Sequence, residues 1–302
     1  MTPPPRTLFV FLDGVGLGAP GEANLLGSLA LPSFERLAGG QRWTSEAQAI
    51  SEPGHVFRPI DATLGVEGLP QSGTGQATLF TGVNCAERAG RHFGPYPHST
   101  SKPTIAEHSL FARLRAAGRV GTFANAYPDR FFRFVEKRSR WTVTTLCCVE
   151  AGVELRREAD LRRGEALAAD LTGAGWREHL GLDVPVITER AAGERLARLS
   201  PEADLVLFEY YLTDKAGHSR DAERAASVLR SLDAFFGGLL GALGPDDRLV
   251  VTSDHGNLED LGTKSHTRNP VPLVALGPGA EALAEVQSLV DVTPALTATP
   301  EK

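Results

Sequence analysis

Short apolar runs that alternate with helical patterns are the feature that most constrains the fold of this chain. The run 7–12 is continuous and stops at Asp13-Gly14, as expected of a buried strand that ends in a turn. Further strands are expected at 119–124, 204–210, 248–252 and 272–276. Helices are expected at 33–37, 77–81, 103–117, 188–199, 221–243 and from 291 onward. This alternation predicts an α/β fold, with a mainly parallel sheet and helices on both of its faces.

The length of 302 residues suits one large domain, or a core with a smaller addition. Residues 1–127 and 186–302 are expected to form a discontinuous core. Residues 128–185 are dense in Arg and Glu, and we expect them to form a small inserted cap or an elaborated loop region. The stretch before Asn84 is rich in Gly, Pro and Ser and is expected to be mostly loop.

Composition argues against several classes of protein. The formal net charge is −6 and no long basic run occurs, so a nucleic-acid partner is not expected. The longest membrane candidate, 234–243, is too short to span a bilayer, and no secretory signal is visible, so a cytoplasmic protein without a membrane partner is expected. Three cysteines without a Cys-x-x-Cys spacing argue against a disulfide framework or a thiolate zinc site.

Polar residues that directly follow the predicted strands are the candidates for chemistry. In an open parallel sheet, ligands bind beyond the carboxyl ends of the strands. Asp214 and His218 are four residues apart, which places them on one face of a helical turn. Three Asp and three His are expected at this one rim: Asp13, Asp214, His218, Asp254, His255 and His266.

This set of side chains indicates a metal centre. Carboxylate oxygens and imidazole nitrogens suit Zn or Mn, with Mg also compatible, and six ligands exceed the four of one tetrahedral zinc. Two divalent metal ions that share the set are therefore expected. Two such ions can hold the attacking and leaving oxygens of an in-line phosphoryl displacement.

Each candidate also has a plain structural interpretation. Asp13-Gly14 is a common turn, and Asp254 and His255 could belong to a surface loop. Asp214 could be an exposed acid or an N-cap, and His218 could be a helix-end histidine bound to a carbonyl. His266 could merely precede a proline turn. Their joint placement at the ends of neighbouring strands favours the metal site.

Ser72 and Thr74 lie in the Gly-rich turn Gln71-Ser72-Gly73-Thr74-Gly75, which opens a helical stretch. The exposed N–H groups and the dipole of a helix N-terminus favour an anion, including a serine alkoxide or a phosphate. A metal ion would lower the hydroxyl pKa further and produce a nucleophile. The alternative for Ser72 is an N-cap serine, and Thr74 competes for either role.

The chain resembles the alkaline phosphatase superfamily, and within it the branch of cofactor-independent phosphoglycerate mutases and phosphopentomutases. Five motifs occur in the order of that family, over roughly residues 6–125 and 188–300. They are Phe11-Leu12-Asp13-Gly14-Val15-Gly16, Gln71-Ser72-Gly73-Thr74-Gly75, Thr213-Asp214-Lys215-Ala216-Gly217-His218, Ser253-Asp254-His255-Gly256-Asn257 and His266-Thr267-Arg268-Asn269-Pro270-Val271-Pro272.

The resemblance implies a role for each motif. It implies one metal ion held by Asp214, His218 and His266. It implies a second ion held by the remaining ligands, namely Asp13, Asp254, His255 and the hydroxyl of Ser72. It also implies that Ser72, three residues before Gly75, accepts the phosphoryl group covalently and is preferred to Thr74 as the nucleophile.

The chain also departs from this family. The mutases carry a substantial Arg-rich second domain, whereas only about sixty residues are available for one here. The acid and the His that follow the nucleophile in the phosphoglycerate mutases are absent, and no Cys-x-Pro-x-Arg context of a sulfatase occurs. Substrate-binding candidates are Arg91, which could grip a phosphate or carboxylate, together with His92, Arg88 and Asn125.

The sequence thus predicts a two-metal enzyme that transfers the phosphoryl group of a small phosphorylated metabolite through a phosphoserine. Water as acceptor makes it a phosphomonoesterase, which a small cap favours slightly, and a substrate hydroxyl makes it a phosphomutase. One alternative is a phosphodiesterase or phosphonate hydrolase on the same core. Another is a non-catalytic protein that binds metal and a metabolite.

Overall fold

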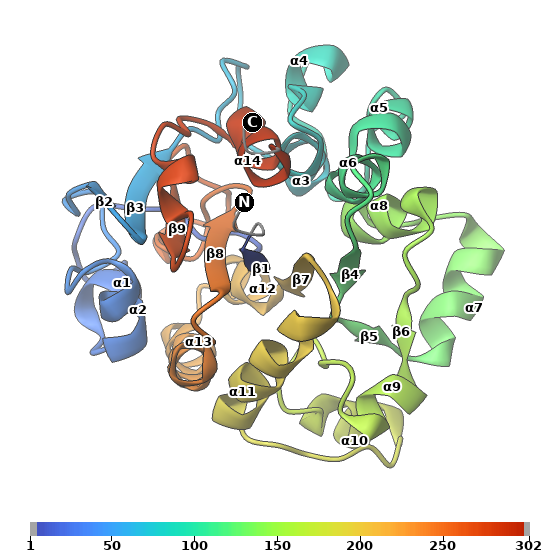
Figure 1. The fold of residues 1–302 in the computed structure, drawn as a ribbon. Helices are drawn as coiled ribbons and strands as arrows, with labels where there is room; N and C mark the ends of the chain where they lie inside the picture. Colours follow the sequence, from blue (N-terminus) through green and yellow to red (C-terminus); the bar gives the residue numbers. More distant parts are fainter. Residues whose placement is uncertain (1–4, 299–302) are drawn as a thin grey trace.

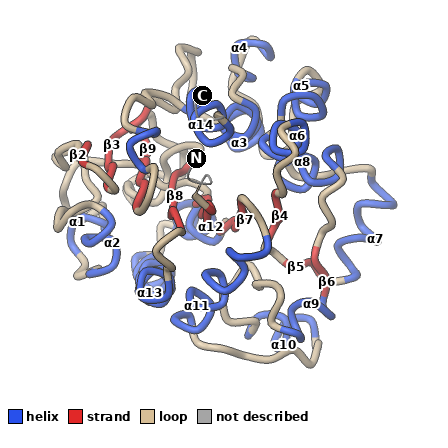
Figure 2. The backbone as a smooth tube through the Cα atoms, in the orientation of Figure 1, coloured by secondary structure: helices blue, strands red, loops and turns tan. Residues whose placement is uncertain are grey.

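A computed structural model describes residues 5–298, whose centre is a seven-stranded sheet (Figures 1 and 2). The strand order is β2-β3-β9-β8-β1-β7-β4. Strands β8, β1, β7 and β4 are parallel, whereas β9 runs antiparallel to β8, β3 to β9, and β2 to β3. The bounds are β1 Arg6–Leu12, β2 Ile50–Glu52, β3 His55–Ile60, β4 Gly121–Phe123, β7 Leu205–Tyr210, β8 Asp247–Ser253 and β9 Val271–Leu276.

Helices cover both faces of the sheet, so the predicted α/β architecture is confirmed (Figure 1). The α-helices are α1 Leu25–Ser28, α2 Pro32–Leu37, α3 Ser72–Thr81, α4 Cys85–Ala89, α5 Ser101–His108, α6 Leu110–Ala116, α7 Asp129–Arg138, α8 Val143–Ala151, α9 Glu158–Arg163, α10 Ala174–Leu180, α11 Glu189–Leu199, α12 Leu212–Ser219, α13 Ala222–Ala242 and α14 Leu289–Thr297. Two 3₁₀ turns, Ser200–Glu202 and Ala280–Leu283, and a small parallel pair, β5 Ala126–Tyr127 with β6 Arg156–Arg157, complete the fold.

The central strand β1 divides the core into two layers, because successive side chains of a strand point to opposite faces. Leu8, Val10 and Leu12 belong to the cluster beneath α11 and α13. Phe9 and Phe11 belong to the cluster beneath α3, α8 and α14, where the Phe11 ring lies edge-on to Phe80 with centroids 5.3 Å apart. Burial on both faces explains why this run is continuously apolar.

Two details differ from the sequence prediction. The stretch before Asn84 is mostly loop, as predicted, but β2 and β3 also extend the sheet there. Pro59 and the shortness of both runs conceal these strands in the sequence. The single helix expected at 103–117 is two helices. Ser109 separates them, with its ψ of 154° and its hydroxyl accepting a hydrogen bond from the Ala112 N–H as the N-cap of α6.

The segment 128–185 contains α7 to α10 and contributes to two packed regions. Helix α8 packs against α3, α5 and α6 in the main core, where Val143, Cys147 and Cys148 are buried. Trp176 and Leu161 pack in a small cluster of their own together with Ala126. The division of the chain into a core and a cap stays a prediction.

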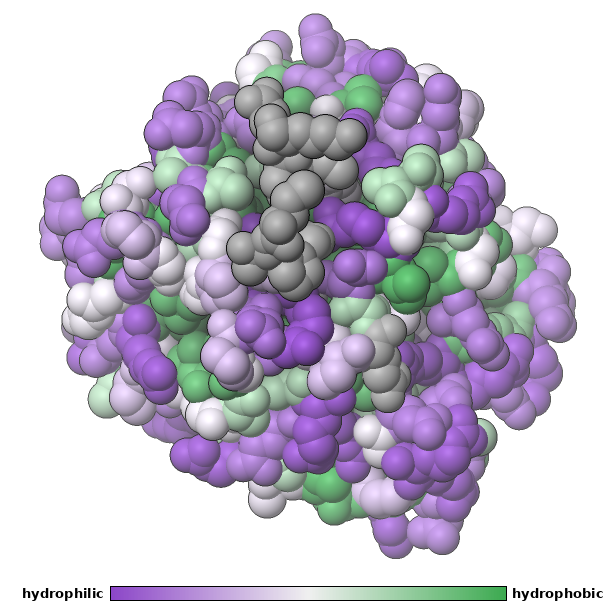
Figure 3. All heavy atoms as spheres, viewed as in Figure 1, coloured by the Kyte–Doolittle hydropathy of each residue, from purple (hydrophilic) through white to green (hydrophobic). Residues whose placement is uncertain are grey.

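The face of the molecule seen in Figure 3 is mostly hydrophilic, and its apolar residues form small separate patches. Among residues 5–298, no helix combines the length and the apolar character that crossing a bilayer requires. The longest helix, α13, carries charged residues along its outer face.

Candidate metal and catalytic site

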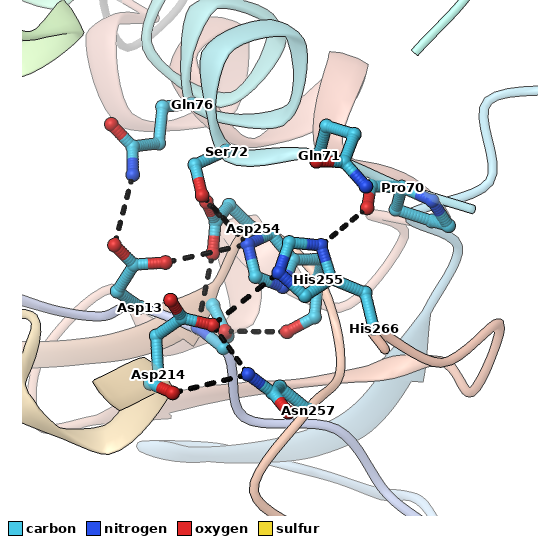
Figure 4. A network of polar contacts seen from close by, with 12 residues as sticks. Asp13, Pro70, Gln71, Ser72, Gln76, Asp214, Asp254, His255, Asn257 and His266 are labelled. Carbon is cyan, nitrogen blue, oxygen red and sulfur yellow. Dashed lines mark hydrogen bonds and ion pairs between the residues drawn. The ribbon is translucent and has the colours of Figure 1, made fainter. Parts of the chain in front are cut away.

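Four segments bring the predicted polar residues together at the carboxyl edge of the sheet (Figure 4). Asp13 directly follows β1, and Asp214 lies in the first turn of α12, just after β7. Asp254 and His255 directly follow β8. His266 enters from the loop between β8 and β9. Strands β1, β7 and β8 are parallel neighbours, so their ends deliver these side chains to one place.

One group of side chains surrounds the Nε2 atom of His255. This atom lies 3.3 Å from Asp13 Oδ1 and 3.5 Å from Asp254 Oδ2. The hydroxyl of Ser72 lies 2.9 Å from the same atom. Asp254 and His255 are fully buried, and Asp13 and Ser72 are nearly so. Asp13, Asp254 and His255 therefore form a buried set of ligand atoms that could hold a metal ion.

A second group lies beside the first and is centred on Asp214. Its carboxylate lies 3.5 Å from His266 Nε2 and 3.3 Å from His218 Nε2, and these two nitrogens are 3.1 Å apart. The His266 ring stacks on the His255 ring with centroids 3.8 Å apart, so the two groups of side chains are in direct contact. Asp214, His255 and His266 form the second set of ligand atoms that could hold a metal ion.

The buried carboxylates of this site favour the binding of cations. Asp13 Oδ1 and Asp254 Oδ2 are buried without a hydrogen-bond partner, which is costly for carboxylates. Burial and the neighbouring Asp13 raise the pKa of Asp254 well above its usual range. Burial alone would lower the pKa of His255, but the charges of Asp254 and Asp13 outweigh it and raise that pKa to about 10. Divalent cations match this donor set of oxygens and imidazole nitrogens.

Backbone carbonyls hold the imidazole rings of the second group. His266 Nδ1 lies 2.7 Å from the Pro70 carbonyl oxygen, and His218 Nδ1 lies 2.7 Å from that of Lys264. A carbonyl can only accept, so each contact requires a proton on Nδ1 and leaves Nε2 free to act as a ligand. Metal-binding histidines are typically oriented in this way.

Ser72 is the first residue of α3, and its hydroxyl points into the first group (Figure 4). Because the helix N-terminus favours negative charge, this position suits an alkoxide or a phosphate. One turn further along α3, Gln76 donates a 3.3 Å hydrogen bond to Asp13. Thr74 is fully buried and its hydroxyl faces away, exchanging hydrogen bonds with the backbone of Phe93.

None of the four candidate substrate residues lines the cavity that opens beside Ser72. This cavity has a volume of about 390 Å³ and is lined by Leu69, Gln71, Ser72, Gly94, Pro95, Asp214, His218, Ser265 and His266. A second cavity, of about 480 Å³, shares three of these residues and is also lined by Arg91 and His92. Arg88 instead donates to Thr104, and the Asn125 side chain pairs with the backbone of Glu209.

Sequence reasoning assigned no role to three polar residues that contact or border the site. Asn257 donates a 2.6 Å hydrogen bond to Asp214 Oδ1, and Gln76 binds Asp13. Glu209 is the next-to-last residue of β7 and pairs with Phe11 of β1, and burial and Asp13 raise its pKa to about 8. The sequence offered one indication of these residues, because each lies within five residues of a predicted ligand or nucleophile.

The cysteines lie outside the site. Cys85, Cys147 and Cys148 are free and buried in the core. Burial raises the pKa of both Cys147 and Cys148, which opposes thiolate formation at neutral pH. Packing is therefore the role that the structure supports for this pair.

Comparison with known proteins agrees with this geometry. A family model described as the metalloenzyme superfamily matches residues 186–299, the segment that contains Asp214, His218, Asp254, His255 and His266. A 2,3-bisphosphoglycerate-independent phosphoglycerate mutase of Natronomonas pharaonis is 32% identical over 134 residues. That match covers 41% of this chain and 26% of the mutase.

Two further comparisons extend this result. A phosphopentomutase of Methylobacterium radiotolerans is 44% identical over 66 residues, which are 22% of this chain and 16% of that protein. The chain thus matches only a minor part of either relative. The alkaline phosphatase of the Antarctic bacterium TAB5 superposes with a TM-score of 0.53 at 11% identity, covering 97% of both chains, so the two proteins share a fold.

Proposed function

Because the chain belongs to the metalloenzyme superfamily and has an alkaline phosphatase-like fold, we propose that it is a two-metal phosphoryl-transfer enzyme. Its substrate is a small phosphorylated metabolite, and Ser72 is its nucleophile. The observation that carries this proposal is the position of the Ser72 hydroxyl. It lies at a helix N-terminus, 2.9 Å from His255, beside buried carboxylate oxygens that have no hydrogen-bond partner.

We assign the candidate ligands to two groups. Asp214, His218 and His266 would hold one ion, and Asp13, Asp254, His255 and Ser72 would hold the other, an assignment that the short distances within each group support. Mn or Zn suits these ligands best, with Mg also compatible. Bound ions supply positive charge for the phosphoryl oxygens and lower the pKa of a coordinated hydroxyl. His255 belongs to both sets of ligand atoms and couples the two groups.

The chemistry assigned to the protein's own residues is a double displacement. The Ser72 hydroxyl loses its proton as Oγ forms a bond to phosphorus and the bond from phosphorus to the leaving oxygen breaks, and the leaving oxygen takes up a proton in its place. The α3 N-terminus stabilises the charge on the resulting phosphoserine. Water then attacks phosphorus, which releases inorganic phosphate and restores the Ser72 hydroxyl; attack by a substrate hydroxyl would instead make the enzyme a mutase.

We favour water as the acceptor, so that the enzyme is a phosphomonoesterase. The side chain of His218 is 43% exposed, so solvent reaches the ligand group that lines the cavity. Arg91 and His92, in the adjoining cavity, are the residues assigned to the non-transferred part of the substrate. Arg88 and Asn125 are less suitable for that role, because their side chains already bind Thr104 and the Glu209 backbone.

The proposal is tested by metal analysis together with phosphate release from a panel of phosphomonoesters. The proteins compared are wild type, Ser72→Ala, and Ser265→Ala as a control that removes another hydroxyl from the same cavity. We expect about two ions per chain in wild type, loss of activity in Ser72→Ala and retention in Ser265→Ala. Full occupancy with unchanged activity in Ser72→Ala would exclude Ser72 as nucleophile and leave Thr74 or a metal-bound water.

A further inference from the structure

Glu259 is a buried carboxylate that accepts hydrogen bonds from four donors. It lies in the loop after β8 and is 1% exposed. Oε2 accepts from the backbone N–H of Gly16 and of Asn257, both at 2.8 Å. Oε1 accepts from the hydroxyl of Thr267 and from the side-chain amide of Asn269, the latter at 3.0 Å. Each carboxylate oxygen therefore has two donors, which is the arrangement that best offsets the cost of burying a carboxylate.

These donors lie close in sequence to three of the candidate ligands, in the loop after β1 and in the long loop between β8 and β9 that also contains Glu259. Gly16 lies three residues after Asp13, in the loop that follows β1. Asn257 lies two residues after His255, and Thr267 is the residue after His266. One carboxylate thus joins the loop after β1 to both ends of the β8–β9 loop, close to Asp13, His255 and His266.

The fourth ligand segment is joined indirectly. The Asn257 backbone N–H donates to Glu259, while its side-chain amide donates to both Oδ1 and the carbonyl of Asp214, at 2.6 and 3.1 Å. Glu259 therefore holds the residue that orients Asp214. Through this one intermediate, the segments that carry the Asp and His candidate ligands are all connected to the same carboxylate.

Three glycines allow the backbone around Glu259 to approach its side chain closely. A Cβ added at Gly16 or at Gly256 would collide with the Glu259 carboxylate, and one added at Gly18 would lie 2.8 Å from its Cγ. None of these three glycines has a positive φ, so backbone conformation does not require them. Close packing against Glu259 is the physical reason for glycine at these positions.

We propose that Glu259 is the positioning residue of the metal centre: it sets the relative placement of the ligand loops without itself binding a metal ion. This inference rests on the proposed function for the identity of the ligands. A positioning residue of this kind affects metal affinity through geometry, and outer residues that orient ligands typically contribute 10–100-fold.

The experiment measures Mn²⁺ and Zn²⁺ affinity by calorimetry and unfolding temperature in chelator, for wild type, Glu259→Gln and Asp247→Asn. Glutamine presents an amide to two of the four donors, which leaves them unpaired. Asp247 is the matched control, a buried carboxylate at the opposite end of β8 that accepts from Arg6, Ser200 and Gly244. We expect both variants to lose stability, but only Glu259→Gln to bind metal about 10–100-fold more weakly.

Thr267→Val separates positioning from loss of negative charge and serves as the second variant if Glu259→Gln does not fold. It removes one donor and leaves the carboxylate in place, so positioning predicts a smaller loss of affinity in the same direction. Unchanged affinity in Thr267→Val, or equal affinity in Glu259→Gln and wild type, would overturn the inference. Wild type that binds no metal would overturn the proposed function itself, a result distinguishable from both.

Discussion

At the scale of single residues, Asp254 and His255 combine complete burial with ionisable groups. Their pKa values are both raised, that of His255 to about 10, so without a cation the site retains protons at neutral pH. Asp214 behaves differently. Burial alone would raise its pKa, but the hydrogen bond with His266 and the interaction with His255 outweigh burial and lower the pKa to about 2. Asp214 is therefore ionised before a metal ion arrives, whereas the other two must lose protons.

This difference predicts that metal binding releases protons. Because His255 and Asp254 are protonated below their raised pKa values, apparent metal affinity should increase as the pH rises from about 6 to 9. Calorimetry in buffers of different ionisation enthalpy would measure the protons released. An affinity independent of pH, with the same observed heat in every buffer, would contradict the assignment of these two residues as ligands.

Glu209 leads to a second prediction at this scale. Its pKa is raised to about 8 by burial and by Asp13. Between about pH 4.5 and 8, the unfolded chain therefore loses a proton that the folded chain keeps, so the free energy of unfolding falls as pH rises. In chelator, Glu209→Gln should raise the unfolding temperature at pH 9 and change it little at pH 5. Glu150→Gln, at an exposed position of α8, is the control; equal effects at both pH values would refute the prediction.

At the scale of elements, α11 and α13 pack closely against each other. A Cβ at Gly193 of α11 would collide with the backbone of Phe235, and a Cβ at Gly238 of α13 with that of Arg190. The two helices thus meet backbone to backbone, through one glycine on each. Their apolar residues could be recognised from helical spacing, but this close approach depends on how the helices pack over β1 and β7.

Gly193→Ala should therefore destabilise the protein by about 1–3 kcal/mol, because overpacking outweighs the better helix propensity of alanine. Gly241→Ala, in the last turn of α13, is the control because a Cβ there would meet no atom within 4 Å. It should be neutral or stabilising by up to about 1 kcal/mol. Urea unfolding of both variants measures the difference, and a stabilised Gly193→Ala would show that the helices are not in backbone contact.

At the scale of the whole molecule, the candidate ligands come from four separate segments of the chain and meet at the carboxyl edge of the sheet. Cations bound there would cross-link the ends of β1, β7 and β8 with the loop before β9. Ligands that bind only the folded state stabilise it, by about 2.7 kcal/mol at a hundredfold excess over Kd.

Chelation should accordingly lower the unfolding temperature, and added Mn²⁺ or Zn²⁺ should restore it. Asp254→Asn should abolish most of this response, since it removes a buried ligand atom from one group. Differential scanning calorimetry with and without chelator measures the shift. Identical unfolding of wild type in both conditions would argue against a metal centre.

The α/β class and the residues of the candidate site could be recognised from the amino-acid sequence alone. A strand buried on both faces has to be apolar along its whole length, so the runs at β1, β7 and β8 are visible locally. The carboxyl ends of parallel strands share one edge, so the acids and histidines that follow them lie together, as Asp13 and Asp254 do. Their roles as ligands stay predictions.

Features that depend on contacts between residues distant in sequence could be recognised only in the folded protein. Pairing direction is one of these: β9 and β3 run antiparallel, and their apolar patterns do not encode this. The environment of a polar side chain is another. Arg88 turned out to bind Thr104, and Glu259, which no motif singled out, accepts from donors up to 243 residues away. A hydrogen bond across loops depends on where the folded chain places both partners, and local spacing does not contain that information.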